Sequence, residues 1–463
     1  MANYDYIDII VATITAALFF VFIYYTRKKN TFENYSVADR SVGMLLLFAS
    51  SSANYIGPGF TIGLVGKGFS TGYLFFFIML VYGMSKIIEG LFIAPNIRNK
   101  FKTSYTIGGI IGGKDSHNNK IVQFVAGVIS FLLMIGFCGI MTMAGGSIIN
   151  SFLGVDKLWG IIIITSISIS IAVFGGLQSS MISDLLQFFL FIVLLPSLGI
   201  IAIYKSNLSL DSFIMTAKQL TTIGYNDMSI IAIVGLLVTW FFGEMLVPPT
   251  ISCILSSKDS KTAKKALSYS GIFMIIWLFI MLSIGIISKV SGIDDLSPDS
   301  VLFKLGSLYL PVGLLGFFSI ALLGVIVSTQ DSLINSASVI FSVDIINVIK
   351  PGSAKRNLLV SRIAGIFVGI IAIVFALKTP SILEGLANIY SVWAPTILIA
   401  LLTSIFLKKV YWQSVLLSMI FGGASSLLVK YSSITIPSII MGIIISLVVY
   451  FSMHFYMKAN AQS

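Results

Sequence analysis

Stretches of about 20 apolar residues recur from one end of the chain to the other, and they limit the folds it can adopt. Hydrophobic residues fill 57% of the 463 positions and charged residues only 10%, against roughly 25% charged residues in soluble domains. Inside lipid every backbone polar group must be paired within the protein, so only helices or closed β-barrels can span a membrane. Barrel strands would alternate apolar and polar residues, whereas residues 188–195 and 272–282 are continuously apolar. The sequence therefore predicts an all-α polytopic membrane protein.

The apolar stretches predict about 13 membrane-spanning helices. The first lies between Asp8 and Arg27, the reverse of the charge order in a cleavable signal peptide, so we expect a retained helix. The ninth is too long for one simple span, which suggests that it begins as a re-entrant or surface helix. The predicted spans are residues 6–26, 42–66, 70–97, 120–150, 157–175, 180–204, 228–255, 264–289, 307–346, 358–377, 381–407, 411–429 and 434–457.

The basic residues predict how these helices are oriented. With the N-terminus outside and the C-terminus in the cytoplasm, most of the 29 Lys and Arg residues fall in cytoplasmic loops, as the positive-inside rule requires. Topology thus accounts for the formal net charge of +11, and we expect no nucleic-acid partner. The predicted location is the plasma (inner) membrane, which the chain crosses many times with the lipid bilayer as its surrounding partner.

Two predicted spans contain residues that break helices near their middle. The second span has Gly57-Pro58-Gly59, and the seventh has Pro248-Pro249. Proline removes a backbone donor and blocks the preceding turn, so both helices should open there. Interrupted helices five spans apart indicate inverted repeats with a binding site near the membrane midplane. The alternative interpretation is a pair of packing kinks, because Gly and Pro are common in membrane helices.

A polar stripe follows one face of the ninth span. Ser328, Asp331, Ser332 and Asn335 are spaced so that they share one face of a helix. An acidic residue inside a membrane is costly and usually marks an ion or substrate path. The stripe offers oxygen ligands without His or Cys, which is the chemistry that a hard cation prefers. We therefore expect an ion to be handled inside the membrane.

The remaining reactive residue types do not indicate an enzyme. Cys138 and Cys253 lie in apolar segments, where small buried hydrophobes are expected rather than a disulfide. His117 and His454 are isolated, and the sequence contains no nucleophile–base or metal-ligand constellation. We expect no catalytic residues.

Three motifs along the chain resemble those of a known family. They lie at residues 52–56 with 63–66, at 175–184 with Gln187, and at 328–338 ending at Asp344. Together they resemble the sodium/solute symporter family, whose members include sodium-coupled proline, sugar, sialic acid and vitamin carriers. The resemblance implies a LeuT-type fold of two five-helix inverted repeats and sodium-driven alternating access that imports a small polar organic solute. The implied divisions are a leading helix at 6–26, repeat one at 42–204, repeat two at 228–407 and trailing helices at 411–457.

The resemblance also implies a main sodium site, with sodium as the co-transported ion. Its ligands would be the carbonyl oxygens of Ala53 and Ile56 in the broken second span. The carbonyl of Val325 and the hydroxyls of Ser328 and Thr329 would complete it. Five neutral oxygens suit sodium, whereas a site without carboxylates would hold a divalent ion poorly.

Some members of the family have a second sodium site, built around an aspartate that Asp184 matches here. Ser328, Asp331 and Ser332 occupy the facing positions, and Asp331 stands where members with that site often have serine. Two acids could bind a cation tightly, or one could be protonated because like charges crowd. Alternatively, Asp184 makes a structural hydrogen bond near a helix start, where its charge favours the macrodipole.

By the family pattern, the solute sits between the broken helices and the third, fourth and eleventh spans. The sequence leaves its type open among sugar, amino acid, carboxylate and vitamin. Lys86 would hold a carboxylate, Glu89 or Glu244 would hold an amine or sugar hydroxyls, and Lys86 and Glu89 could instead neutralise each other at i, i+3. The candidate lining residues are Asn54, Tyr55, Lys86, Glu89, Phe137, Thr142, Trp240, Glu244, Asn388, Tyr390 and Trp393.

Two other functions remain open from the sequence. A proton-coupled carrier of the same fold would use Asp184 with Asp331 as its titrating groups. A non-transporting solute sensor would bind the solute without moving it. No signalling domain follows the last predicted span, so the sequence favours the sodium-coupled carrier.

Overall fold

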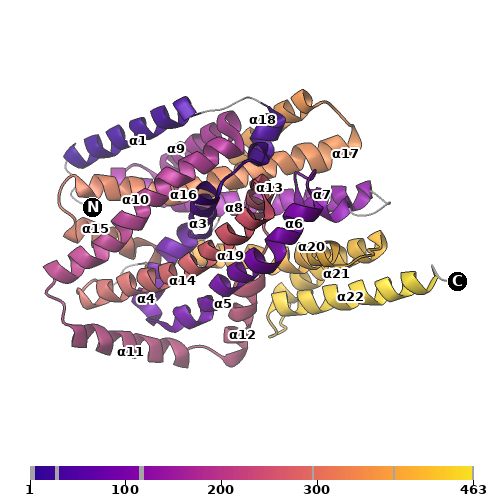
Figure 1. The fold of residues 1–463 in the computed structure, drawn as a ribbon. Helices are drawn as coiled ribbons and strands as arrows, with labels where there is room; N and C mark the ends of the chain where they lie inside the picture. The colour runs from indigo at the N-terminus through magenta and orange to yellow at the C-terminus, as the bar shows by residue number, and fades with distance from the viewer. Residues whose placement is uncertain (1–5, 27–30, 114–118, 295–296, 379–380, 461–463) are drawn as a thin grey trace.

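The computed structural model describes residues 6–26, 31–113, 119–294, 297–378 and 381–460. The described residues form an α-helical bundle (Figure 1), and their one isolated extended pairing joins Val42 and Ser257. The α-helices are α1 (Tyr6–Thr26), α2 (Phe32–Val37), α3 (Met44–Tyr55), α4 (Leu64–Thr71), α5 (Leu74–Ile88), α6 (Ala94–Lys100), α7 (Ile107–Gly112), α8 (Lys120–Leu153), α9 (Lys157–Ser170), α10 (Gly176–Lys205), α11 (Leu210–Asn226), α12 (Ile230–Phe242), α13 (Pro248–Ser256), α14 (Ser260–Val290), α15 (Val301–Tyr309), α16 (Leu314–Ile340), α17 (Asn347–Ile349), α18 (Ala354–Ala376), α19 (Ile382–Trp393), α20 (Ile399–Phe406), α21 (Trp412–Lys430) and α22 (Ser438–Asn460). Short 3₁₀- or π-helical segments extend them at η1 (Ala38–Arg40), η2 (Gly59–Gly63), η3 (Glu89–Ile93), η4 (Ile171–Gly175), η5 (Pro298–Ser300), η6 (Phe341–Ile346) and η7 (Ala394–Leu398). The predicted all-α fold is confirmed.

The helices are long and apolar enough for a membrane. Nine helical stretches in the described residues can cross one, and α11 with α12 adds a pair bent by 105°. One of the nine, Lys157–Lys205, contains two predicted spans, and it is interrupted at Gly176, whose φ of 68° is not helical. Because every predicted span coincides with helical residues, the arrangement fits the predicted count.

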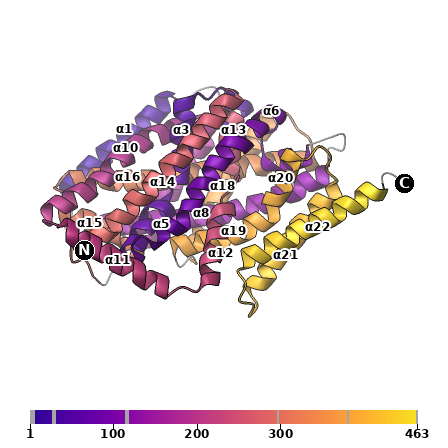
Figure 2. The same ribbon diagram turned by 60° about the horizontal axis from the view of Figure 1, so that its bottom comes forward.

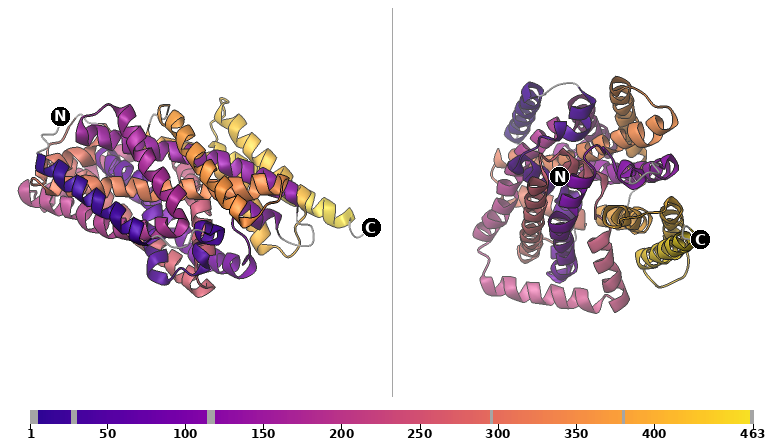
Figure 3. Two further views of the ribbon diagram at one scale, coloured as in Figure 1. Left: turned by 90° about the horizontal axis from the view of Figure 1, so that it is seen from above. Right: turned by 45° about the vertical axis from the view of Figure 1, so that its right-hand side comes forward.

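The ninth predicted span starts later than expected. α15 ends at Tyr309, and α16 begins only at Leu314. Residues 307–309 of the predicted span belong to α15, and the continuous helical stretch Leu314–Ile349 is still 36 residues long. None of the predicted spans includes α11, which lies at the edge of the bundle (Figures 1 and 3).

Side-chain caps fix where several helices begin. Asp259 Oδ1 accepts the N–H of Thr262 at 2.7 Å at the start of α14, and Ser229 accepts the N–H of Ala232 at 3.2 Å at the start of α12. Such caps satisfy N–H groups that have no partner within the helix. The backbone hydrogen bond from Thr262 also keeps the pKa of Asp259 below its usual value. These helices therefore start where the sequence supplies a cap.

The helices that matter most for function lie inside the bundle. α16 is the most buried of the spanning helices, and α3, α8, α10 and α18 pack against it. α21 and α22 pair with each other at one edge (Figure 2), whereas α1 lies on the far side (Figure 1). A polar face on α16 therefore meets protein on all sides rather than lipid.

The leading helix α1 packs against α16 and supplies the carboxylate that caps it. Asp8 is almost fully buried, and its Oδ1 accepts the N–H groups of Gly313 at 2.7 Å and Gly316 at 3.0 Å. These N–H groups lie at the start of α16, where the helix dipole also favours a negative charge. Asp8 thus caps a helix about 300 residues further along the chain.

We predict that Asp8→Ala lowers the thermal unfolding midpoint of the purified protein, because caps of this kind contribute about 0.5–2 kcal/mol. Thr13→Ala is the matched control, since the Thr13 hydroxyl bonds only within its own helix, to the carbonyl of Ile9 at 2.7 Å. Thermal unfolding followed by intrinsic fluorescence measures both. An Asp8→Ala midpoint equal to that of Thr13→Ala would refute the capping role.

Candidate functional site

The first break separates α3 from α4 in the middle of the bundle. The hydrogen-bond ladder of α3 continues to Ile56, whose N–H donates to the carbonyl of Ser52 at 3.1 Å. The chain then turns at Gly57 and Pro58, and Pro58 has no N–H to offer the carbonyl of Asn54. Carbonyl oxygens are thereby opened at a depth where lipid offers no donor.

The predicted sodium ligands on this broken helix are Ala53 and Ile56, which are both fully buried. The carbonyl of Ile56 accepts a hydrogen bond from Thr61 Oγ1 at 2.6 Å, from beyond the break. A carbonyl oxygen has two lone pairs. One hydrogen bond therefore leaves the Ile56 oxygen able to bind a cation as well.

α16 brings three more oxygen atoms to the break. The carbonyl of Val325 accepts hydrogen bonds from Ser328 Oγ at 3.1 Å and Thr329 Oγ1 at 3.2 Å. A Cβ atom added to Gly57 would lie 2.9 Å from Thr329 Oγ1, which places this hydroxyl directly against the break. The structure thus brings the α16 members of the predicted sodium site next to the helix that carries its other members.

A second polar cluster joins α10 to α3 and α16. Asp184 Oδ2 accepts hydrogen bonds from Ser50 Oγ at 2.5 Å and Asn54 Nδ2 at 3.4 Å. One turn earlier on α10, Ser180 Oγ donates to Asp331 Oδ1 at 2.7 Å. Two buried carboxyl groups therefore meet at this part of α10: Asp184, which α10 itself carries, and Asp331 of α16, which Ser180 binds.

Several buried oxygen atoms in this cluster have no hydrogen-bond partner among the described residues. Ser332 Oγ is 3.3 Å from Ser180 Oγ and so is already paired. Buried polar groups are almost always satisfied, and an unpaired buried carboxylate is strongly destabilising. Positive charge, as a cation or a proton, would satisfy this set. The unpartnered atoms are Asp184 Oδ1, Asp331 Oδ2, Asn54 Oδ1 and Asn335 Oδ1.

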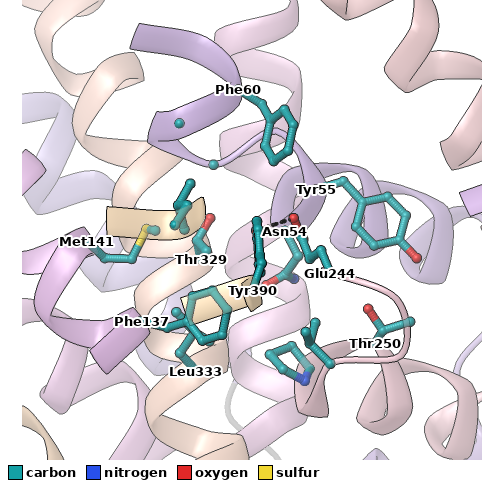
Figure 4. A pocket seen from close by; sticks show the side chains of 15 residues that line it. Asn54, Tyr55, Phe60, Phe137, Met141, Glu244, Thr250, Thr329, Leu333 and Tyr390 are labelled. Atoms are coloured by element: carbon teal, nitrogen blue, oxygen red, sulfur yellow. Dashed lines mark hydrogen bonds between the residues drawn. The ribbon is translucent and has the colours of Figure 1, made fainter. Parts of the chain in front are cut away.

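A cavity lies between the two breaks, α8, α16 and α19 (Figure 4). Its volume is about 40 Å³, little more than one water molecule occupies in the liquid. Five predicted residues line it: Asn54, Tyr55, Phe137, Glu244 and Tyr390. The lining also includes residues not predicted for it, namely Gly57, Gly59, Phe60, Met141, Val247, Pro249, Thr250, Thr329, Leu333 and Leu386.

Six of the predicted lining residues lie outside the lining of this cavity. Thr142 Oγ1 instead accepts a hydrogen bond from Gln330 Nε2 at 2.7 Å, and Trp240 packs behind the lining with its ring 5.3 Å from that of Phe60. Asn388 is exposed on α19. The other three, Lys86, Glu89 and Trp393, bind the second break.

The second break, between α12 and α13, is held by side chains of neighbouring helices. Lys86 Nζ donates to the carbonyl of Glu244 at 2.8 Å, and Trp393 Nε1 donates to that of Met245 at 3.2 Å. Leu246 has a φ of 57°, a strained value for a residue with a side chain, and its N–H donates to Glu89 Oε1 at 2.8 Å. The backbone groups opened here are therefore satisfied without a ligand.

Lys86 and Glu89 form a fully buried ion pair. Lys86 Nζ is 3.2 Å from Glu89 Oε1 and lies over the rings of Tyr55 and Tyr82, at 4.6 Å and 5.2 Å from their centroids. The sequence left open whether this pair binds the solute or neutralises itself, and the observed ion pair corresponds to mutual neutralisation. In this structure the pair braces the second break rather than facing the cavity.

A larger cavity of about 350 Å³ lies nearer one end of the bundle, lined in part by Lys157 and Asp299. Both cavities border η2, α8 and α19. α19 packs closely on η2 here: a Cβ atom on Gly59 would lie 2.4 Å from Leu386, and one on Gly63 would lie 2.7 Å from Leu383. Leu386 lines the smaller cavity and Ile382, one turn earlier, lines the larger one, so a single turn of α19 links the two linings.

The opposite end of the bundle is closed by α2. Tyr35 Oη is 3.0 Å from Ser338 Oγ, and the Tyr35 carbonyl accepts from Asn335 Nδ2 at 3.2 Å. Asn34 Nδ2 donates to Gln178 Oε1 at 2.5 Å. The polar face of α16 is therefore covered by α2 at this end.

Two opposed breaks, buried oxygen clusters and a cavity between the breaks are the features of an α-helical membrane transporter. Residues 35–422 match the sodium:solute symporter family, and the chain belongs to that family. It is a sodium-coupled secondary active symporter that imports a small organic solute by alternating access, and it is not an enzyme. The proton-coupled and sensor alternatives are not favoured.

Individual relatives cover most of the chain at low identity. The high-affinity proline transporter PutP of Bacillus subtilis (strain 168) is 22% identical over 426 residues, 86% of this chain and 87% of that protein. The human sodium/myo-inositol cotransporter is 22% identical over 448 residues, 85% of this chain and 61% of that protein. A substrate-bound, outward-open Na⁺-coupled sialic acid symporter has a TM-score of 0.84 at 16% identity, covering 96% of this chain and 97% of that one. The structural likeness confirms the predicted LeuT-type fold.

We predict that Lys86→Met lowers the thermal unfolding midpoint strongly, because removing one partner of a buried ion pair costs about 3–5 kcal/mol. Lys86→Met combined with Glu89→Gln should recover part of the loss, since no buried charge is then left unpaired. Lys289→Met is the matched control: Lys289 pairs with Asp294 at 2.6 Å on the surface, where such pairs contribute about 0–1 kcal/mol. Equal midpoints for Lys86→Met and Lys289→Met would contradict the bracing role.

Proposed function

We propose that one sodium ion binds between the first break and α16. Its ligands are the carbonyl oxygens of Ala53, Ile56 and Val325 and the hydroxyls of Ser328 and Thr329. The observation that supports this most is that a Cβ atom on Gly57 would lie 2.9 Å from Thr329 Oγ1, so this hydroxyl of α16 faces the opened helix. Thr329 and Ser328 both donate to the carbonyl of Val325, which keeps these three oxygens together on α16. A bound sodium ion would supply the partner that carbonyls opened in lipid require. It would also join the broken helix to α16.

We further propose a second monovalent cation at Asp184, with Asp331, Ser328 and Ser332 on the facing helix. The unpartnered oxygens of Asp184 and Asp331 support this site. Two ionised carboxylates in one buried cluster would repel each other, so a positive charge between them is favoured. The alternative structural role of Asp184 is weaker, because its Oδ1 has no hydrogen-bond partner among the described residues.

In the proposed mechanism the cavity between the two breaks is too small for an organic solute in the present state and widens to receive it. Two residues connect this cavity to the cation sites. Thr329 lines the cavity and belongs to the proposed sodium site, and Asn54 lines it while bonding Asp184. A change in cation occupancy therefore alters groups that face the solute, which is the energetic coupling that symport needs. The relatives carry proline, myo-inositol and sialic acid by name, so we expect a solute of this size range.

We propose that the N-terminus lies outside the plasma membrane and the C-terminus in the cytoplasm. The larger cavity then faces outside, and α2 closes the cytoplasmic side. Arg40, Arg98 and Lys258 lie at that side and support the orientation through the positive-inside rule. Arg27, Lys28, Lys29 and Lys114, which contribute to the same count, lie outside the described residues.

The proposed division of the chain follows the breaks. Repeat one would run over 42–204 and repeat two over 228–407, with the leading helix at 6–26 and trailing helices at 411–457. The break at Gly57-Pro58 lies in the first helix of repeat one, and the break before Pro248 lies in the first helix of repeat two. Lipid would contact the outer faces of the bundle, where apolar side chains such as Phe367 and Val374 are exposed.

We predict that Ser328→Ala and Thr329→Ala each raise the sodium concentration for half-maximal stabilisation about tenfold, the equivalent of about 1.4 kcal/mol. Each loses one neutral oxygen ligand. The readout is the unfolding midpoint as sodium replaces choline at constant ionic strength, which requires no knowledge of the solute. Ser319→Ala is the matched control on α16, because its hydroxyl bonds only to the carbonyl of Leu315. Unchanged sodium dependence in both variants would exclude the proposed ligands.

We predict that Asp331→Asn reduces the cooperativity of the same sodium titration, with the Hill coefficient falling from about 2 towards 1, because the coefficient cannot exceed the number of coupled sites. The amide keeps the size of the side chain but removes its charge. The curve should still respond to sodium through the first site. A wild-type curve already described by one site would argue against the second cation.

A further inference from the structure

The solute cavity has an uneven distribution of charge. Among the described residues that line it, Glu244 is the one charged side chain, and no Lys, Arg or His lies in the lining. Glu244 is 9% exposed, so its carboxyl group is largely shielded from water. The cavity therefore presents a negative group without a facing positive group.

The nearest cation does not compensate Glu244 from within the cavity. The ammonium group of Lys86 is fully buried and is paired with the carboxylate of Glu89 at 3.2 Å. Its bond to Glu244 goes to the backbone carbonyl, at 2.8 Å. With all three groups ionised, Lys86 and Glu89 balance each other, and Glu244 leaves the group with a net charge of −1.

The hydrogen-bonding groups of the lining are also mainly acceptors. Glu244 Oε2 accepts from Tyr390 Oη at 2.5 Å, which uses the donor of that hydroxyl. The hydroxyl of Tyr55 is directed to Glu89 Oε2 at 3.5 Å. Asn54 Oδ1, on the opposite break, is a buried acceptor without a partner among the described residues. The two breaks thus offer acceptors to whatever enters between them.

Apolar side chains make up most of the remaining surface. In the view of Figure 4, Phe60 lies on one side, Phe137 and Leu333 lie on another, and Glu244 and Tyr390 lie between them. Such a lining accommodates a compact apolar body and leaves one end polar. Aromatic faces beside a carboxylate also favour a positive charge.

We infer that the transported solute carries a protonated amine, which Glu244 binds while the aromatic side chains hold a small apolar body. This rests on the proposed solute cavity and names the chemical class of its ligand. A solute whose only charge is negative would meet the Glu244 carboxylate in a weakly screened site, which is unfavourable. A neutral polyol would leave the excess negative charge unbalanced. Glu244 is therefore the residue that sets specificity, and Tyr390 positions it.

The test uses ligand pairs that differ in one nitrogen. L-Proline and pyrrolidine contain the amine, cyclopentanecarboxylate has the same ring size without it, and myo-inositol represents a neutral polyol. The full chain is purified, and its unfolding midpoint is measured with each probe in sodium chloride and in choline chloride. We expect an amine-containing probe to raise the midpoint in sodium, and we expect no response to cyclopentanecarboxylate or myo-inositol.

The variant Glu244→Gln keeps the shape of the side chain and removes its charge. We expect it to weaken amine binding at least tenfold while leaving the sodium-dependent rise in midpoint intact, and Ser319→Ala should leave both unchanged. The inference is overturned if the nitrogen-free probes stabilise as well as the amines, if no amine stabilises, or if Glu244→Gln binds the amine normally. Loss of the sodium response in the wild type would instead count against the proposed sodium site, so the two failures are distinguishable.

Discussion

Two broken helices expose backbone N–H and carbonyl groups inside the membrane, and the rest of the structure depends on how these groups are paired. Lipid provides neither donors nor acceptors, so each opened N–H and carbonyl needs a partner from the protein or from a ligand. The two breaks meet this requirement differently. At the second break Lys86, Glu89 and Trp393 bind the opened groups, and no ligand is required. At the first break a carbonyl–hydroxyl cluster is left beside α16, where a cation can complete it. The second break is braced by protein side chains, and the first is the break at which we propose that sodium binds.

α16 connects these features because one of its faces is polar along several turns. Ser328 and Thr329 lie against the first break, Asp331 reaches α10, and Asn335 reaches the carbonyl of Tyr35 on α2. A polar stripe of this length is tolerated because α16 is enclosed by other helices rather than by lipid. The same face therefore meets the proposed ion sites and the closed end of the bundle.

Local features were predictable from the sequence, and long-range pairings were not. Gly57-Pro58 and Pro248-Pro249 act on their own backbone, so the sequence predicts both breaks correctly. The spacing from Ser328 to Asn335 likewise predicts a shared helix face. Lys86 donates a hydrogen bond to the carbonyl of Glu244, 158 residues further along the chain, and no local sequence pattern predicts this pairing. The partner of Thr142 is equally hard to predict: its hydroxyl accepts a hydrogen bond from Gln330, which lies between Thr329 and Asp331 in the sequence. The positions of the ion ligands follow from the family resemblance and remain a prediction, and the structure adds that Thr329 faces Gly57 at the first break.

α19 reaches both cavities, with Leu386 lining the smaller one and Ile382 the larger one. The same helix carries Tyr390, which bonds Glu244 at 2.5 Å, and it contributes no proposed sodium ligand. α19 packs closely on η2 at Gly59, where an added Cβ atom would lie 2.4 Å from Leu386. A side chain introduced at Gly59 would therefore displace the helix that positions the proposed solute ligand and would leave each proposed cation ligand chemically unchanged.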